Sequence, residues 1–347
     1  MSSCTSNSKF YVRLLLIVAL FLSMYFVVGF ALDFIVQRRT NKSRFTQRGT
    51  SKLTHLKLNH KVGELDIIFV GSSRTEYHMS QRSFRDNGML VYNLGVSGAK
   101  LSSYASTLKG ALGRKPKSVV LSLSVQTLYE ESWDFPITID WFSLKAVLES
   151  GANLRDGLNA IAHLAEGTNK IRVYADGVSS RVKKSYDRFE PRKKISKKAE
   201  EKKPAPLFDE RECRIIQNSK KGKGKATLKC SNGDSILMGG GFDESKIAEK
   251  TVLKNLNPSK MKYLNQLHAF AKAQGSELIF VLEPTYKTEF LYDLSEIKSV
   301  LKAPLFDNTG LYRGNKDIWF DQGHLNYSGK KRYSEHLAGQ LKSSLGQ

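Results

Sequence analysis

Two polar turns, far apart in the chain, carry the side chains that could perform covalent chemistry. Gly71-Ser72-Ser73 follows Asp66–Val70, an apolar run rich in β-branched residues, and Asp321 and His324 stand three residues apart near the C-terminus. A serine hydroxyl is a poor nucleophile until a base removes its proton, and a carboxylate can orient that base. The two turns together predict a Ser/His/Asp nucleophile system.

Of the two adjacent hydroxyls, Ser73 is the better candidate, because Ser72 lies closer to the end of the predicted strand. A side chain at a strand-to-helix turn is exposed and lies beside the free backbone N–H groups of the first helical turn. Those N–H groups can stabilise the oxyanion that forms on attack. The alternative is that Ser72 and Ser73 cap the next helix, while Asp321 and His324 belong to an ordinary surface turn.

A third turn, Asn93–Ala99, ends the next predicted strand. Glycine lets the backbone approach a ligand closely, so the N–H of Gly98 is a candidate second donor to an oxyanion. An ordinary tight turn between a strand and a helix is the alternative. The other histidines form no spacing that indicates a metal, and Gly239-Gly240-Gly241 lacks the Lys and Ser/Thr of a phosphate loop. No cofactor is therefore expected.

The elements around these turns follow the alternation of an α/β domain. Strands are predicted at 66–73, 89–96, 118–125 and 277–284, and helices at 80–85, 98–112, 260–273 and from Asn326 or Ser328 to about Leu341. Such alternation at short spacing predicts a parallel, doubly wound sheet with right-handed crossovers. Ligands of such sheets bind just beyond the carboxyl ends of the strands, where Ser73 falls.

At this point the residues resemble a known family. Gly71-Ser72-Ser73, Gly98 and Asp321-x-x-His324 match the order and wide spacing of the first, second and last blocks of the SGNH/GDSL hydrolases. The resemblance covers roughly 65–128 and 277–343. It is closest to the membrane-anchored branch, where Gly-Ser-Ser replaces Gly-Asp-Ser and which includes the D-alanyl transfer protein of teichoic acid modification and acetyltransferases of exported polysaccharides.

The resemblance implies a flavodoxin-like three-layer α/β/α fold. It also implies Ser73 as nucleophile, His324 as base, Asp321 as orienting acid, and an oxyanion hole made by the N–H groups of Ser73 and Gly98. The family's third block, Gly-x-Asn-Asp, is matched only loosely here, where Gln126 follows the third strand and could supply the side-chain donor. Further candidate pocket residues are Ser72, Arg74, His78 and Asn93, although His78 also fits an ordinary helix-face residue.

Residues 10–32 are predicted to form one transmembrane helix. The run Leu14–Leu32 is apolar apart from Ser23, Tyr25 and Gly29. Nineteen residues at ~1.5 Å each span roughly 28 Å, close to the hydrocarbon thickness of a bilayer. A cleaved signal peptide is the alternative. The positive-inside count mildly favours a cytoplasmic C-terminal flank, but the resemblance favours residues 1–9 inside and the body outside.

The remaining chain is expected to divide into a basic stalk (33–60), an α/β core (61–128 and 277–347) and an insert or lid (129–276). Within the insert, 181–225 holds 17 Lys and Arg against 7 Asp and Glu. Such a block attracts acidic glycans or anionic lipids, or else forms a solvated loop. Cys213 and Cys230 lie in the same polar segment and could pair in an oxidising compartment, or remain free thiols.

Two functions from different classes fit these observations. The first is a membrane-anchored, extracytoplasmic serine esterase or O-acyltransferase, with acetyl the expected group. It would act on a cell-envelope polysaccharide, with a membrane protein as one source of the acyl group. The second is a non-catalytic SGNH-fold protein for envelope assembly or glycan binding. The formal net charge is +22, but an extracytoplasmic body makes nucleic acid an unexpected partner.

Overall fold

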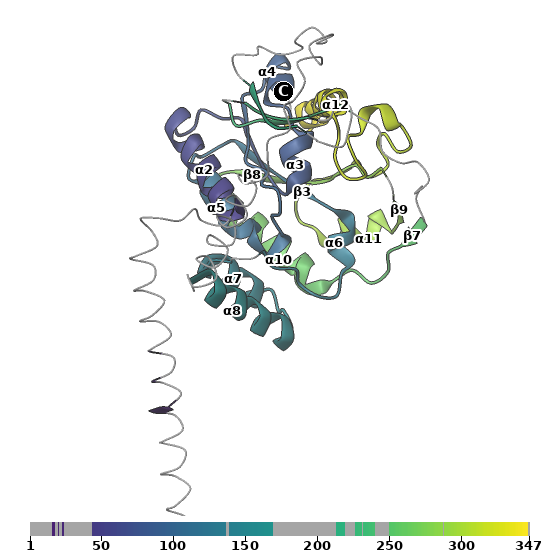
Figure 1. The fold of residues 1–347 in the computed structure, drawn as a ribbon. Helices are drawn as coiled ribbons and strands as arrows, with labels where there is room; N and C mark the ends of the chain where they lie inside the picture. The colour runs from purple at the N-terminus through teal and green to yellow at the C-terminus, as the bar shows by residue number, and fades with distance from the viewer. Residues whose placement is uncertain are drawn as a thin grey trace, which may run out of the picture.

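The computed structural model describes residues 16, 17, 20, 23, 44–136, 139–168, 213–218, 226–230, 232–239, 250–286 and 288–345. In this part of the chain, helices surround a central parallel sheet of five strands (Figure 1). From edge to edge the strands are β10 (Leu305–Asp307), β8 (Glu277–Leu282), β3 (Ser118–Leu123), β1 (Ile67–Val70) and β2 (Val91–Asn93). The chain thus proceeds from β1 to one edge and from β3 to the other, so that the strand order reverses between β1 and β3.

The central strands β1, β3 and β8 are buried on both faces almost throughout, which is why they are rich in apolar residues. Successive residues enter opposite layers of the core. Ile68 and Val70 of β1 belong to one buried cluster, whereas Ile67 and Phe69 belong to the other. Helices close both clusters, and the arrangement is consistent with a three-layer α/β fold.

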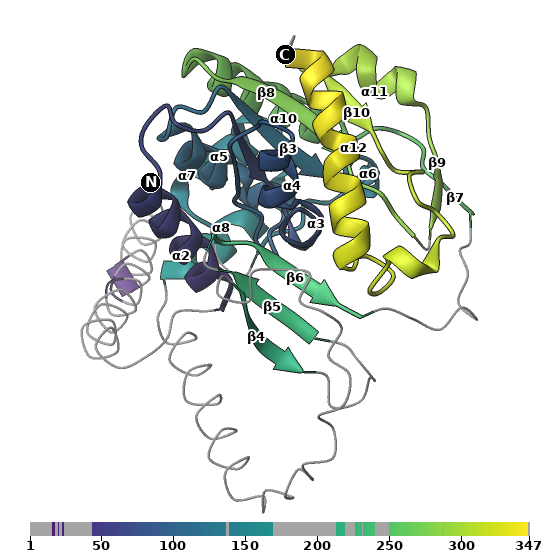
Figure 2. The same ribbon diagram turned by 90° about the horizontal axis from the view of Figure 1, so that it is seen from above.

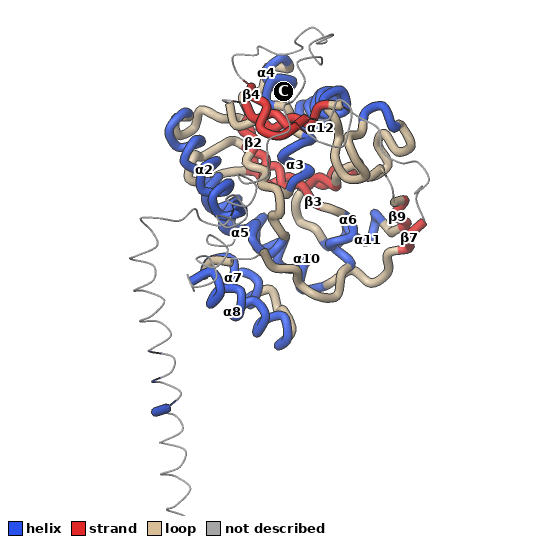
Figure 3. Tube along the Cα trace, in the orientation of Figure 1, coloured by secondary structure: helices blue, strands red, loops and turns tan. Residues whose placement is uncertain are grey.

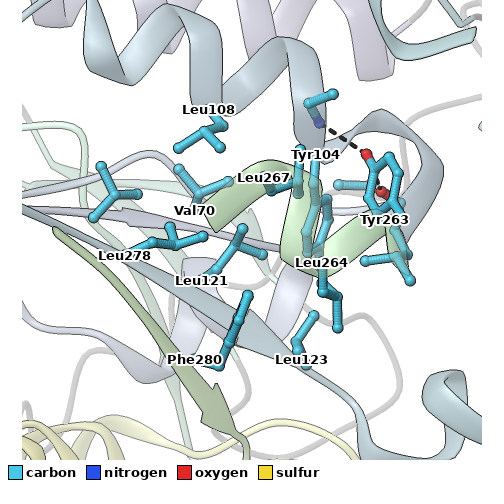
Figure 4. Packing of buried hydrophobic residues seen from close by; sticks show 14 of the residues in the cluster. Val70, Tyr104, Leu108, Leu121, Leu123, Tyr263, Leu264, Leu267, Leu278 and Phe280 are labelled. Carbon is cyan, nitrogen blue, oxygen red and sulfur yellow. Dashed lines mark hydrogen bonds between the residues drawn. The ribbon is translucent and has the colours of Figure 1, made fainter. Parts of the chain in front are cut away.

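The first face is covered by α2 (Arg44–Asn59), α5 (Tyr104–Leu112) and α10 (Pro258–Ala273). Figure 4 shows Leu108 and Leu264 of these helices over the strand residues Val70, Leu121 and Phe280. The hydroxyl of Tyr263 accepts from the N–H of Ala105 at 3.0 Å and donates to the carbonyl of Leu101 at 3.1 Å. This buried phenol therefore connects α10 to the start of α5, which follows the short 3₁₀ helix η1 (Leu101–Ser103).

The second face is covered by α12 (Tyr327–Leu345) and α4 (Gln81–Asp86). Tyr333, Leu337 and Leu341 of α12 are fully buried against the sheet. Asn326 caps this helix, because its side-chain oxygen accepts from the N–H of Gly329 at 3.0 Å. The short helix α3 (Ser73–His78) lies between α12 and the carboxyl end of β1 (Figure 1).

Between β3 and β8 the chain leaves the sheet. It forms α6 (Val125–Tyr129), α7 (Trp141–Glu149), α8 (Leu154–Thr168), β4 (Cys213–Asn218), β5 (Ala226–Cys230), β6 (Ser235–Met238) and β7 (Lys250–Val252). β4, β5 and β6 make an antiparallel sheet beside α4 and α12 (Figures 2 and 3). Cys213 and Cys230 form a disulfide between β4 and β5. The C-terminal part adds β9 (Glu289–Leu291), which pairs with β7, then α11 (Leu294–Val300) and the 3₁₀ helix η3 (Lys316–Ile318).

Three sequence-based expectations differ from the structure. Residues 44–59 of the expected stalk form α2, which buries Leu56 in the core. The helix α10, placed in the insert (129–276), packs on the central sheet instead. The fifth strand, β10, was missed because only three residues pair. Most of 10–32 and most of 181–225 lie outside the described residues, and within those described no helix is long and apolar enough to cross a bilayer.

Candidate active site

Ser73, His324 and Asp321 lie in a hydrogen-bonded row. The hydroxyl of Ser73 is 2.9 Å from Nε2 of His324. Nδ1 of the same ring is 2.9 Å and 3.0 Å from the two carboxylate oxygens of Asp321. With a proton on Nδ1, the ring donates to Asp321 and accepts from the serine hydroxyl. This is the arrangement that a serine nucleophile and its base require.

The turn after β1 places Ser73 at the edge of the sheet. Ser73 is the first residue of α3, and Ser72 is its N-cap without a side-chain capping bond. Gly71 is required for this turn, because a Cβ there would lie 2.0 Å from Oγ1 of Thr75. The N–H of Ser73 has no acceptor within its own helix, since it belongs to the first helical turn.

The turn that carries the acid and the base is held by its own backbone. Oδ1 of Asp321 accepts from the N–H groups of Gly323 at 2.8 Å and His324 at 2.9 Å. The N–H of Phe320 donates to the carbonyl of His324 at 2.9 Å. Burial opposes ionisation of Asp321, but the contact with His324 and the two N–H donors outweigh it and lower the pKa of the carboxyl. Asp321 is therefore ionised at neutral pH.

A cavity of about 310 Å³ adjoins the nucleophile. One wall comes from the turns after the strands, and the opposite wall from residues before α7 and on α10. The lining comprises Ser72, Ser73, Arg74, Gly98, Ala99, Lys100, Leu101, Tyr104, Leu123, Ser124, Thr127, Glu130, Trp133, Asp134 and Lys260. This volume lies at the lower end of the range for small-molecule sites. The cavity can hold an acyl group and part of a sugar or a similar alcohol.

The predicted oxyanion donors fall in different places. Gly98 lines the cavity, and its φ of 88° lies in the region that favours glycine. Gln126 is exposed on α6 and does not line the cavity, so its predicted role as the third donor is not supported by its position. Gln126 and Thr127 both lie in the first turn of α6, but on different faces of the helix. Thr127 faces the cavity together with Ser124, whereas Gln126 points away from it.

Of the other predicted pocket residues, Ser72 and Arg74 line the cavity, but Asn93 and His78 do not. Asn93 is fully buried, and its amide donates to the carbonyls of Thr75 at 3.0 Å and Met79 at 2.9 Å. It therefore connects β2 to α3. In the sequence, a buried asparagine at a strand end cannot be distinguished from an asparagine whose amide lines a pocket.

His78 is buried behind His324, the candidate base. Its ring packs against Trp319 and Tyr333, with its centroid 6.4 Å from that of His324. Burial, together with the charges of His324 and Arg74, lowers the pKa of His78 well below its usual value. His78 is therefore neutral and supports the position of the His324 ring from behind.

Glu283 is an acid beneath the site that the sequence analysis missed. It follows β8 directly, is 1 % exposed and accepts from the hydroxyl of Thr75 at 3.1 Å. Burial raises the pKa of Glu283 to about 7, although the charge of Arg74 and the bond from Thr75 oppose this shift. An acidic residue directly after the apolar run Leu278–Leu282 is the signal in the sequence that could have revealed it.

A second buried carboxylate, Glu76, connects α3 to the antiparallel sheet. Glu76 forms an ion pair with Lys229 of β5 and accepts from the hydroxyl of Ser235 at 2.8 Å and the N–H of Ser97 at 2.9 Å. Burial opposes ionisation, but Lys52 and Lys229 hold the pKa of Glu76 well below its usual range. The helix that begins with the nucleophile is thus tied to the sheet of β4, β5 and β6.

Comparison with known proteins adds no relative from which a role could be transferred. No protein-family model matches the chain, and no curated protein is significantly similar to it. Within the described residues, no group of three or more His, Cys, Asp or Glu side chains is arranged to hold a metal ion. The chemistry of the site must therefore be inferred from Ser73, His324, Asp321 and the cavity beside them.

Proposed function

We propose that the protein is a serine esterase or O-acyltransferase with a flavodoxin-like, SGNH-type fold. The observation that carries the proposal is the hydrogen-bonded row of Ser73, His324 and Asp321 next to the cavity. The strand order, with β2 and β1 on one side of β3 and with β8 and β10 on the other, supports the flavodoxin-like assignment. The proposed substrate is an acylated polyol or polysaccharide, with acetyl as the expected group.

In the first half-reaction, the hydroxyl oxygen of Ser73 attacks the ester carbonyl while Nε2 of His324 takes the hydroxyl proton. The tetrahedral intermediate then collapses, and the leaving alcohol receives that proton from Nε2. The products are the free alcohol and an ester on Ser73. Asp321 accepts a hydrogen bond from the Nδ1–H group throughout and stays ionised, which holds the tautomer that leaves Nε2 free to take the serine proton.

In the second half-reaction, a hydroxyl group attacks the ester on Ser73. Nε2 of His324 takes the proton of this hydroxyl and returns it to the serine oxygen. Water as the attacking group gives hydrolysis, and a sugar hydroxyl gives acyl transfer. The N–H groups of Ser73 and Gly98 are the proposed oxyanion donors in both halves. The exposed position of Gln126 means that this residue does not supply the side-chain donor of the third family block, which is compatible with an acyltransferase as well as with a slow hydrolase.

The cellular setting is part of the proposal. The apolar run at 10–32, the disulfide between Cys213 and Cys230 and the basic segment 181–225 fit a body anchored to a membrane and exposed to an oxidising compartment. An acidic cell-envelope glycan is the partner that such a basic segment would attract.

A fluorophosphonate probe tests the proposal, because it phosphonylates a serine only when a base activates it. The full-length chain should be labelled, and peptide mapping should place the adduct on Ser73. Ser73→Ala should abolish labelling. Ser72→Ala is the matched control, since Ser72 lines the same cavity but only Ser73 is hydrogen-bonded to His324.

His324→Gln should reduce the labelling rate by more than ~1,000-fold, because the hydroxyl then has no base. Circular dichroism of each variant should match that of the unaltered chain. Labelling that persists in Ser73→Ala would contradict Ser73 as the nucleophile and direct attention to Ser72. A folded unaltered chain that is not labelled would contradict the enzyme and favour the glycan-binding alternative.

A further inference from the structure

Arg74 is an unpaired cation beside the nucleophile. It follows Ser73 on α3 and lines the same cavity. Its Nη1 atom is buried and makes no hydrogen bond, and no described carboxylate lies within 4 Å of its guanidinium. A buried donor without an acceptor is costly, and arginine has five donors arranged to bind a carboxylate with two parallel bonds.

The other cations that line the cavity already have partners. Lys100 is paired with Asp134, and Lys260 lies 3.6 Å from Glu130 and donates to the carbonyl of Thr127 at 2.9 Å. Among the described lining residues, Arg74 therefore provides the positive charge that is available to a ligand. The apolar side chains of Leu101, Leu123 and Trp133 line the same cavity and can contact the rest of that ligand.

From this arrangement we infer that the cavity binds a carboxylate of the substrate through Arg74, so that the preferred ester carries a carboxylate close to its reacting carbonyl. The inference rests on the proposed acyl chemistry at Ser73. The carboxylate has two possible sources with the same chemistry. It is part of the acyl group, as in a succinyl ester, or part of the alcohol, as in a uronic acid.

Glu283 supports this assignment. It is the buried acid whose charge acts on Arg74, but the two groups do not form an ion pair within 4 Å. Glu283 instead accepts from the hydroxyl of Thr75 and is 1 % exposed. It therefore interacts with the guanidinium only at longer range, and the hydrogen bond that Nη1 of Arg74 lacks is left for a substrate carboxylate to make.

Three aryl esters separate the sources of the carboxylate. 4-Nitrophenyl acetate is neutral, mono-4-nitrophenyl succinate carries a carboxylate on the acyl group, and 4-acetoxybenzoate carries one on the leaving group. For each ester, kcat/KM of the full-length chain is divided by that of Arg74→Gln, so that differences in intrinsic reactivity cancel. At least one anionic ester should lose ~10-fold more than the neutral ester, because a hydrogen-bonded charge is removed. The ester that is affected identifies the source.

Lys100→Gln is the matched control. It removes the same formal charge from the lining of the same cavity, but from a cation that Asp134 already pairs. Its ratio for anionic over neutral esters should change much less than that of Arg74→Gln. Arg74→Lys should retain part of the preference. Equal losses for all three esters in Arg74→Gln, or equal effects of Lys100→Gln, would overturn the inference.

A binding measurement keeps the inference separate from the catalytic proposal. Saturation-transfer NMR on the full-length Ser73→Ala chain uses sodium glucuronate and sodium succinate as ligands and glucose as the neutral comparison. The site is supported, even if no ester is turned over, when an anion shows saturation with Ser73→Ala, loses it with Ser73→Ala/Arg74→Gln and keeps it with Ser73→Ala/Lys100→Gln. No saturation of either anion, or saturation that does not depend on Arg74, overturns it. If the unaltered chain had no esterase activity while the anion still bound, the proposed function would be contradicted, but the anion site would not.

Discussion

At the residue scale, the position of the His324 ring depends on one carboxylate. Asp321 accepts from Nδ1 and from the two N–H groups of its own turn. Asp321→Asn keeps the size of the side chain but removes the acceptor that selects the Nδ1–H tautomer. We predict a loss of kcat for ester cleavage of ~10,000-fold, with little change in stability. Stopped-flow cleavage of 4-nitrophenyl acetate measures it.

Asp317→Asn is the control for that prediction, since Asp317 lies in the same region of the chain and its side chain is exposed. Its rate should equal that of the unaltered chain. An Asp321→Asn variant that retains more than about a tenth of the rate would contradict this prediction. It would mean that a group other than Asp321 orients the His324 ring.

Glu283 should make stability depend on pH. The folded chain keeps its proton up to a pKa of about 7, whereas the unfolded chain releases it near 4.5. Between these values the folded state binds more protons, so the free energy of unfolding falls as the pH rises. The contribution of the protonated Glu283 carboxyl to the free energy of unfolding is complete below pH 4.5 and lost above pH 7. The difference between the two pKa values corresponds to about 3 kcal/mol. The charge of Arg74 acts on this carboxyl, and the phenols of Tyr104 and Tyr333 near it have raised pKa values, so neither phenol ionises in this range.

His78 acts in the opposite direction over the same range, because its lowered pKa makes stability rise with pH up to about 6.5. The test is therefore the difference between the unaltered chain and Glu283→Gln, measured by urea unfolding at pH 5 and pH 8. Glu283→Gln should be more stable relative to the unaltered chain at pH 8 than at pH 5. A difference that does not change with pH would show that Glu283 titrates normally.

How much of the site could be predicted varies with the kind of residue. Ser73, Asp321 and His324 were identified because their types and their turns are distinctive in sequence, and the structure brings them together. Gln126 was assigned a role that its position does not support, and Glu283 was missed, because what decides each is the direction of one side chain at a strand end. That direction is set by the pitch of α6 and by the burial of β8 among its neighbours.

At the element scale, the antiparallel sheet positions the nucleophile helix. Lys229 of β5 pairs with Glu76, three positions after Ser73, and Glu76 is 1 % exposed. Lys229→Met keeps the length of the side chain but leaves the carboxylate with fewer partners. We predict a loss of roughly 2 kcal/mol in the free energy of unfolding, below the usual cost of breaking a buried pair because Lys52 still acts on Glu76.

The double variant Glu76→Gln/Lys229→Met should recover most of that stability, because the buried charge is then absent. Urea unfolding of the four members of this cycle measures the coupling. Additive losses would indicate that the pair makes no net contribution and that the sheet is held by its apolar contacts alone.

Two elements were unrecognisable for physical reasons. α2 is polar along most of its length, and among its described side chains Leu53 and Leu56 are the apolar ones that pack on the core, so its helical period is almost invisible in the sequence. β10 has only three residues, which pair with β8, and three residues are too few to show a strand pattern in the sequence. The central strands were predictable because both of their faces are buried, which demands long apolar runs.

At the scale of the whole molecule, the alternation of strands and helices was sufficient to predict a parallel sheet, but the path of the insert was not. The chain leaves the sheet after β3 and returns with α10 and β8, and in between it forms an antiparallel sheet against α3 and α12. The place of this sheet on the helices depends on contacts such as those of Gln81, the first residue of α4, with Asp234 beside β6. These contacts join residues with no relation in the local sequence.

The disulfide is the feature of the insert with the largest expected effect on the whole chain. Cys213 and Cys230 close a loop of 17 residues, which in the chain-entropy model stabilises by ~3 kcal/mol. The bond joins β4 to β5, and β6 beside them contacts both α3 and α12. Cys213→Ser/Cys230→Ser should therefore unfold at lower urea concentration and label more slowly with a fluorophosphonate. Non-reducing peptide mapping of the unaltered chain should yield the linked pair, whereas two freely alkylated thiols in the native protein would refute it.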